Sequence, residues 1–311
     1  MNKPNFEKVK HKSDENDILQ QKSNAFSAYK IEKDYQTVYY FLKDSGFSEN
    51  FITNLRKVKG FILINDQIAT TKSFLPKGSV LSICNNPNPK TAIMQCILPL
   101  DIVYEDAYYL LLNKPANIST MPNRSHYSNN LAGAICGYMQ NKQPGFTLRI
   151  LNRLDKDTSG LILVAKNAIA QKEIKDIEKT YLAICEGKID KACTISKPIL
   201  TLQENGVNAR KRVISEKGQK AETFITPLKF LDDSTLLSIR LHFGRTHQIR
   251  VHLSSIGHPL IGDQIYGKKS EKINRTALHC SQMSFFHPYL KKKLSFTASL
   301  PQDFANLLDR F

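Results

Sequence analysis

Residues 151–160 (LNRLDKDTSG) carry the densest group of side chains that could do chemistry. Two carboxylates, two basic groups and two hydroxyls stand directly before residues 161–165 (LILVA), an apolar run typical of a strand buried on both faces. The polar residues are therefore predicted to form a loop at the edge of a rigid core, where functional groups are often held. Such residues are also typical of an ordinary polar turn, and residue types alone leave the roles of Arg153 and Asp155 open.

A second candidate segment begins at residues 237–241, where apolar and polar side chains alternate and predict a strand. Gly244 is expected to turn the chain, and Thr246 is a plausible N-cap for a helix that ends at Gly257. Arg245 then lies at the junction between the strand and the helix. From there its guanidinium could bind a carboxylate or a phosphate through two hydrogen bonds.

Six of the eight histidines lie between residues 242 and 287, which raises the question of a metal site. The sequence has no H-E-x-x-H motif, and the spacing of His247 and His252 does not place both rings on one face of a helix. We therefore expect no metal site, and we interpret these histidines as structural or phosphate-contacting residues.

The composition indicates a water-soluble protein that meets polyanions. The chain has 311 residues and a formal net charge of +16, which favours binding to nucleic acid, although a lysine-rich solvated surface would give the same number. No stretch approaches the length of a membrane helix, and residues 1–35 do not resemble a signal or transit peptide. Six cysteines without a C-x-x-C pair suggest free thiols in a reducing compartment. We expect a cytoplasmic protein with no membrane segment.

The order of predicted elements indicates an α+β protein with two folded parts. We expect a polar extension over residues 1–34 with one short helix around 24–30, a small α+β module over 35–85, a linker over 86–98, and a large domain over 99–311. The module should contain two short helices on either side of Gly46. The large domain should contain a mixed, mainly antiparallel sheet, with strands at 108–112, 161–165, 180–185, 223–225 and 236–241 and a helix at 168–178.

The module at 35–85 resembles the small S-four-like RNA-binding domain of a ribosomal protein. The resemblance places Arg56, Lys57 and Lys59 at the end of its second helix, where they would contact phosphates. A generic small α+β unit with solvated lysines is the alternative.

Residues 152–161 closely resemble the catalytic motif of the RluA-type pseudouridine synthases, and residues 244–253 with 257–263 resemble the C-terminal motif of that family. Further matches occur in the order of the family, at residues 104–106, 113–115, 179–183 and 277–280. Together they span about residues 99–290. Two departures stand out: Asn152 replaces the usual histidine, and Asn117 replaces a frequent glycine but tolerates a positive φ angle.

The resemblance implies an enzyme that isomerises uridine in RNA to pseudouridine without a cofactor, acting as a monomer on ribosomal or transfer RNA. Asp155 would act at the bond between ribose and base, Arg245 would pair with it, and Tyr181 would pack against the uracil. Arg153 would contact the RNA backbone or occupy the gap left by a flipped-out uridine. The remaining substrate-binding residues would be Lys179, Arg210 and Arg212 in this domain. The alternatives are an RNA-binding protein that no longer catalyses, and a hydrolase that releases free uracil.

Overall fold

The computed structural model describes residues 26–87, 93–122, 128–140, 142–143, 146–204 and 207–309; the side chains of 203, 204 and 207–210 are outside this description. The chain divides into two compact units. The first comprises Met1–Lys90 with Asn167–Lys172, and the second comprises Thr91–Lys166 with Glu173–Phe311. Within the described ranges, no helix is long and apolar enough to cross a membrane.

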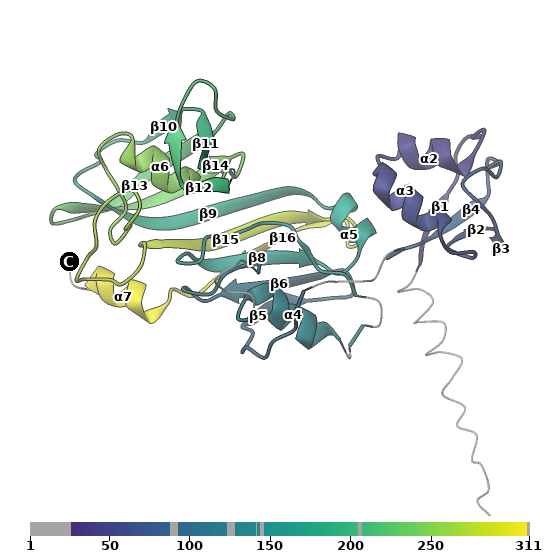
Figure 1. Ribbon diagram of the computed structural model, residues 1–311, viewed down its shortest axis with the longest axis horizontal. Helices are drawn as coiled ribbons and strands as arrows, with labels where there is room; N and C mark the ends of the chain where they lie inside the picture. The colour runs from purple at the N-terminus through teal and green to yellow at the C-terminus, as the bar shows by residue number, and fades with distance from the viewer. Residues whose placement is uncertain are drawn as a thin grey trace, which may run out of the picture. The chain divides into compact units, whose positions relative to one another are not determined.

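The first unit is an antiparallel sheet of four strands, with two helices that follow the first strand in the sequence (Figure 1). Its elements are β1 (Phe26–Lys30), α2 (Val38–Asp44), α3 (Glu49–Arg56), β2 (Ile62–Ile64), β3 (Gln67–Ile68) and β4 (Val80–Cys84), and the strand order is β1-β4-β2-β3. The two helices predicted on either side of Gly46 are confirmed. The short helix predicted around residues 24–30 is wrong over the described residues 26–30, because these form β1 and pair with β4. A partner strand some 50 residues away overrides the weak local pattern.

The hairpin between β2 and β3 shows how the turn sequence sets the register. Asn65 and Asp66 both have positive φ angles, 47° and 63°, as the two-residue turn of a twisted hairpin requires. The Asn65 side chain also accepts a hydrogen bond from the Val80 backbone N–H at 2.9 Å. The turn therefore joins the hairpin to β4, one of the two inner strands of this sheet.

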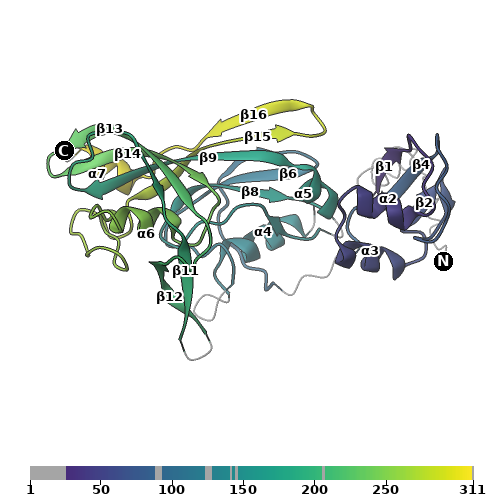
Figure 2. The same cartoon turned by 90° about the horizontal axis from the view of Figure 1, so that it is seen from above.

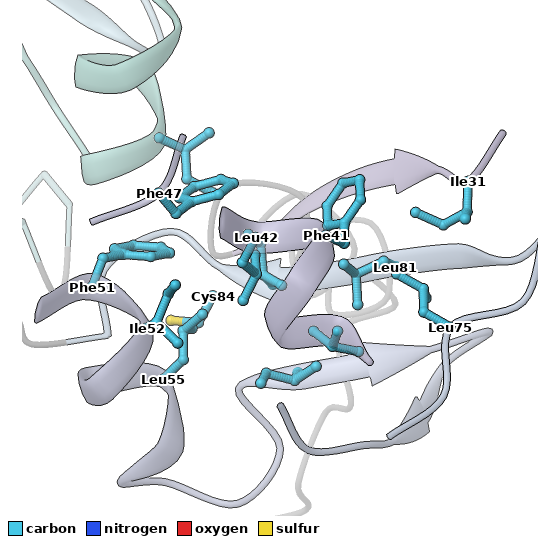
Figure 3. Packing of buried hydrophobic residues seen from close by; sticks show 14 residues of the cluster. Ile31, Phe41, Leu42, Phe47, Phe51, Ile52, Leu55, Leu75, Leu81 and Cys84 are labelled. Carbon is cyan, nitrogen blue, oxygen red and sulfur yellow. The ribbon is translucent and has the colours of Figure 1, made fainter. Parts of the chain in front are cut away.

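The core of the first unit includes a residue from far along the chain. Fourteen buried residues form the core cluster, most of them from the helices and strands shown in Figure 3, and one is Ile169 in α5 (Ala168–Glu173). The Ala168 N–H donates to the Asn85 carbonyl at 3.2 Å, and the Lys172 Nζ lies 4.2 Å from the centre of the Phe47 ring. Helix α5 is thus a structural part of this unit, which sequence reasoning missed. The predicted helix over 168–178 ends at Glu173, because the following residues form a strand.

We expect Ile169→Ala to destabilise the first unit by about 2–5 kcal/mol, because it removes a side chain that is 1% exposed and leaves a cavity. Urea unfolding with hydrogen exchange should report the loss at backbone amides of residues 26–87. Gln171→Ala, an exposed position on the same helix, is the control and should stay within about 0.5 kcal/mol of wild type. Equal effects of the two changes would show that α5 is not part of this core.

The second unit is built on a sheet of ten strands, drawn in Figures 1 and 2. Its path is β10-β13-β14-β9-β15-β8-β6-β5, with β16 paired to β15 and β7 paired to β8. Among the described pairings, β15 with β8 is parallel and the others are antiparallel. The predicted α+β class and the mixed, mainly antiparallel sheet are confirmed. The strands are β5 (Ile102–Glu105), β6 (Tyr109–Lys114), β7 (Arg149–Ile150), β8 (Ser159–Ala165), β9 (Lys175–Glu186), β10 (Cys193–Ser196), β13 (Glu222–Leu231), β14 (Ser234–His242), β15 (Leu278–His287) and β16 (Lys292–Thr297).

Helices and a separate hairpin complete this unit: α4 (Leu131–Met139), α6 (Gln248–Ser254), α7 (Gln302–Asp309), and β11 (Ile199–Glu204) paired with β12 (Val207–Ile214). Helix α7 packs Phe304 and Leu307 into a buried cluster with Ile184. The hairpin projects from the sheet in Figure 2 and is anchored by Ile199, which packs in a cluster with Val251 of α6.

Every residue of β8 is buried, as its apolar sequence predicted. Its single glycine, Gly160, permits an unusually close approach between β8 and β15. Gly160 has a φ of +113°, and a Cβ atom added there would lie 2.3 Å from the backbone oxygen of Cys280 in β15. Only glycine fits this contact, which sets β8 and the loop before it against the centre of the sheet.

Candidate active site

The polar segment predicted to be a loop connects β7 to β8, and hydrogen bonds attach it to β8 and to Thr120. The Asn152 side chain donates to the Leu161 carbonyl at 3.0 Å and accepts from the Leu163 N–H at 2.8 Å. Thr120 Oγ1 donates to the Leu154 carbonyl at 2.6 Å. Asn152 thus serves as a buried two-point attachment to the backbone of β8, where the motif that the sequence resembles usually has a histidine. Asn117 has a φ of +64°, as expected.

A fully buried lysine also holds this loop. The Lys114 ammonium donates to three backbone carbonyls, those of Pro115, Ile118 and Lys156, at 2.8, 2.9 and 3.1 Å. Burial lowers its pKa to about 7, while the nearby charges of Asp155 and Asp157 oppose that change. Three carbonyl acceptors match the three N–H groups of the protonated form. Sequence reasoning assigned no role to Lys114.

Asp155, held by this loop, presents one anchored and one open carboxylate oxygen. Its Oδ2 accepts from Arg250 Nη1 at 3.1 Å and lies 3.7 Å from His247 Nε2. For Oδ1, no hydrogen-bond partner occurs within the described residues. One oxygen therefore fixes the orientation, and the other is available to a substrate.

Arg250 is itself locked by a second carboxylate. Its Nε and Nη2 each donate to Asp263 at 2.7 Å, and the Asp263 side chain is completely buried. Burial disfavours the charge on Arg250, but the hydrogen bonds and charges of Asp263 and Asp155 outweigh it and raise the pKa of the guanidinium. Burial also disfavours the charge of Asp263, and its bonds to Arg250 outweigh this and lower its pKa. Asp263, Arg250 and Asp155 form one hydrogen-bonded chain, called here the aspartate–arginine–aspartate chain.

The prediction that Arg245 pairs with Asp155 is wrong. Its Nε donates to the Lys220 carbonyl at 3.1 Å, and its guanidinium lies over the Phe243 ring. The helix predicted to start after Thr246 starts instead after His247, which has a left-handed φ of 59°. Arg245 lies before this helix and binds the Lys220 carbonyl, while Arg250 lies within the helix and donates to Asp155.

Two cavities meet at Asp155. A cleft of about 650 Å³ is lined by segments 119–122, 153–157 and 244–247 together with Arg250 and Ile265. A smaller adjoining pocket also includes Tyr181, which is 5% exposed on β9. Burial is the main cause that raises the pKa of Tyr181 well above its usual value, with Cys280 and Asp155 adding to it, so the phenol stays neutral. The structure therefore brings Asp155, Tyr181 and Arg245 around one pocket.

The residues predicted to bind RNA lie in several places. Arg153 is exposed and lines the cleft. Lys179, whose pKa burial lowers, lines a different hollow of about 640 Å³. Arg212 donates its backbone N–H to Tyr266 near the cleft, and the side chain of Arg210 lies outside the description.

The predicted basic residues of the first unit lie at the end of α3. Arg56 Nε donates to Thr71 Oγ1 at 3.0 Å, and Lys57 Nζ donates to Asn54 Oδ1 at 2.7 Å. Lys59 is exposed in the following turn. Arg56 and Lys57 thus have partners inside the unit, although both remain exposed.

Four of the clustered histidines bind other side chains or the backbone. His252 contacts Thr223 Oγ1, His258 contacts the Glu186 carbonyl, His279 contacts Ser159 and His287 contacts Asp106, at 2.7 to 2.9 Å. In the described ranges, no three histidine, cysteine or acidic side chains are grouped so as to hold a metal ion. These four rings have structural partners.

Comparison with known proteins identifies the family. Residues 108–255 match the model of the RNA pseudouridylate synthase family. An uncharacterized RNA pseudouridine synthase of Bacillus subtilis (strain 168), YjbO, is 34% identical over 283 residues, which cover 88% of this chain and 98% of that protein. The chain belongs to the RluA family of RNA pseudouridine synthases. It is therefore an enzyme, an isomerase that acts on RNA.

Two other relatives cover the catalytic unit of this pseudouridine synthase. The ribosomal large subunit pseudouridine synthase D of Zymomonas mobilis is 37% identical over 66% of this chain and 71% of its own length. The solved structure of human RNA Pseudouridylate Synthase Domain Containing 1 shares 26% identity and a TM-score of 0.52, over 65% of this chain and 84% of that one. The resemblance found in the sequence motifs is confirmed.

We expect Arg250→Met to destabilise the synthase by about 3–5 kcal/mol, because it leaves the buried Asp263 carboxylate without its partner. Arg245→Met removes one partly exposed hydrogen bond and should cost about 1 kcal/mol or less. The measurement is urea unfolding of both variants beside the wild type. The reverse order of the two effects would contradict the assignment of Arg250 as the partner of Asp155.

Proposed function

We propose that this enzyme converts specific uridines of ribosomal RNA to pseudouridine, with Asp155 acting at the ribose of a flipped-out uridine. The observation that supports the mechanism is that Asp155 lines the cleft with its Oδ2 held by Arg250 and its Oδ1 without a hydrogen-bond partner among the described residues. The ribosomal substrate is supported by the relative named ribosomal large subunit pseudouridine synthase D. Transfer RNA is the other outcome that the experiment below distinguishes.

The reaction breaks the bond between uracil N1 and ribose C1′, turns the uracil, and joins C5 to C1′. A carboxylate next to C1′ can act as a nucleophile at that carbon or as a base at the neighbouring one. Arg250 keeps the Asp155 side chain oriented, as this role requires. A neutral Tyr181 ring beside the same pocket would pack against the uracil while it turns.

Basic residues around the cleft would bind the surrounding RNA. Arg153 is exposed next to Asp155 and would fill the space left by the flipped-out base. We propose that Lys179, Arg210 and Arg212 contact phosphates, and that Arg56, Lys57 and Lys59 of the first unit do the same. The net charge of +16 supports a sequence-independent attraction to phosphates. Such a substrate places the enzyme in the cytoplasm.

We expect cells that lack this protein to lose one or a few pseudouridines from ribosomal RNA, and transfer RNA to keep its own. The measurement is site-resolved pseudouridine mapping of both RNA classes. Wild-type protein should restore the missing sites. Asp155→Asn should not, because the amide keeps the shape of the side chain but has neither the charge nor the basicity.

Three results would contradict parts of this proposal. Loss of sites from transfer RNA alone would overturn the ribosomal substrate. Restoration by Asp155→Asn would overturn the role of the carboxylate. Release of free uracil from RNA by the purified wild type would favour a hydrolase.

A further inference from the structure

We propose that His247 is a further catalytic residue, which donates a hydrogen bond from Nε2 to the O2 carbonyl of the target uracil as its bond to the ribose breaks. This inference rests on the proposed function, and it assigns a specific group to the charge that develops on the base. Four observations support it: the backbone of His247, its hydrogen-bond partner, its unpaired nitrogen and its charge state.

The backbone of His247 holds the imidazole in the cleft. His247 has a φ of 59° and stands directly before α6, where its carbonyl accepts the helix bond from the Val251 N–H at 2.9 Å. A left-handed conformation is uncommon outside glycine, and such positions gather at functional sites. Its side chain is 13% exposed and lines the cleft above Asp155.

A chain of hydrogen bonds fixes which ring nitrogen carries the proton. The Arg212 backbone N–H donates to the Tyr266 hydroxyl oxygen at 2.7 Å, and that hydroxyl lies 3.0 Å from His247 Nδ1. Burial is the main cause that raises the pKa of Tyr266, so the phenol keeps its proton. The oxygen accepts from Arg212, and its own hydrogen can be donated to Nδ1. We assign Nδ1 as this acceptor, which puts the hydrogen of the neutral ring on Nε2.

The Nε2–H group points at the space that the substrate must enter. Nε2 lies 3.7 Å from Asp155 Oδ2, and within the described residues no acceptor lies within hydrogen-bond distance of it. The atom is not fully buried, so a substrate in the cleft can supply the acceptor. Because Asp155 acts at the ribose carbon that carries N1, the uracil carbonyl next to N1 is the acceptor nearest to this position.

The surroundings keep the imidazole neutral. Burial is the main cause that lowers the pKa of His247. The negative charges of Asp155 and Asp263 act to raise this pKa, and the positive charges of Arg250 and Arg212 act to lower it further. A neutral ring can donate a hydrogen bond without neutralising the Asp155 carboxylate, the arrangement by which a neutral imidazole polarises a carbonyl in another isomerase. A protonated ring would instead form an ion pair with Asp155.

The bond-breaking step balances without a proton transfer. In the nucleophilic course, an Asp155 carboxylate oxygen forms a bond to C1′, and the pair of the broken N1–C1′ bond leaves with the uracil as an anion shared between N1, O2 and O4. The Nε2–H bond to O2 strengthens as this charge develops, which is the condition for lowering the barrier rather than merely binding substrate. When C5 attacks C1′, the bond between C1′ and the Asp155 oxygen breaks and its electron pair returns to the carboxylate. The hydrogen on C5 then leaves as a proton and N1 gains one, so the charge on the ring falls and the hydrogen bond from His247 weakens.

The test uses His247→Asn, because asparagine tolerates the left-handed backbone and its short amide does not reach the position of Nε2. The matched control is His242→Asn, the same change at a histidine that is 63% exposed and pairs with Glu222. The substrate is an RNA fragment in which the wild type makes pseudouridine, prepared with either uridine or 2-thiouridine at the target. Sulfur at position 2 is a weaker acceptor than oxygen.

We expect His247→Asn to lower the single-turnover rate by about 10²–10³-fold, as the loss of one such donor does elsewhere, while the Kd for RNA stays unchanged. His242→Asn should react like the wild type. The 2-thio substrate should slow the wild type much more than it slows His247→Asn, because the variant has already lost the bond to position 2.

Two results would overturn the assignment. A wild-type rate for a folded His247→Asn would show that the imidazole has no catalytic role. Equal slowing of both proteins by 2-thiouridine would show that His247 acts at another atom. A wild type that makes no pseudouridine in any RNA would instead overturn the proposed function, and this proposal with it.

Discussion

The aspartate–arginine–aspartate chain is the interaction on which the rest of the catalytic unit depends. Asp263 is completely buried and the Arg250 side chain is 4% exposed, so each needs the other to remain charged. That pairing leaves one guanidinium nitrogen for Asp155, which is 25% exposed at the floor of the cleft. A buried ion pair of this kind contributes little net stability compared with apolar residues. Its effect here is to give the Asp155 carboxylate one orientation and one open oxygen.

The surrounding fold holds both ends of this chain. Helix α6 carries Arg250, and the loop that follows this helix carries Asp263. The Asp263 carboxylate also accepts from the backbone N–H groups of Ile265 and Tyr266. On the other side, Lys114 and Asn152 fix the loop of Asp155 to β6 and β8 through backbone atoms. The close contact at Gly160 then sets that loop against the centre of the sheet.

The sequence predicted what depends on local pattern. The apolar run of β8, the alternation of β14 and the paired helices around Gly46 were all readable, and the family motifs located the catalytic loop. What it missed depends on distant partners: β1 is a strand because of β4, and Ile169 is buried by residues more than 80 positions away. Arg250 was missed although it lies in a recognised motif, because that motif holds two arginines and only the folded arrangement shows which of them binds Asp155.

The central claim is that Arg250 orients Asp155 because Asp263 holds Arg250. The most direct test is the single-turnover rate of pseudouridine formation by Asp263→Asn, since this buried side chain cannot touch the RNA. The asparagine can keep the bonds from the Ile265 and Tyr266 N–H groups but not both bonds to the guanidinium. The account predicts a folded enzyme with unchanged RNA affinity and a rate lower by about 10²-fold, as expected for a misplaced catalytic group. A folded Asp263→Asn enzyme with the wild-type rate would contradict it.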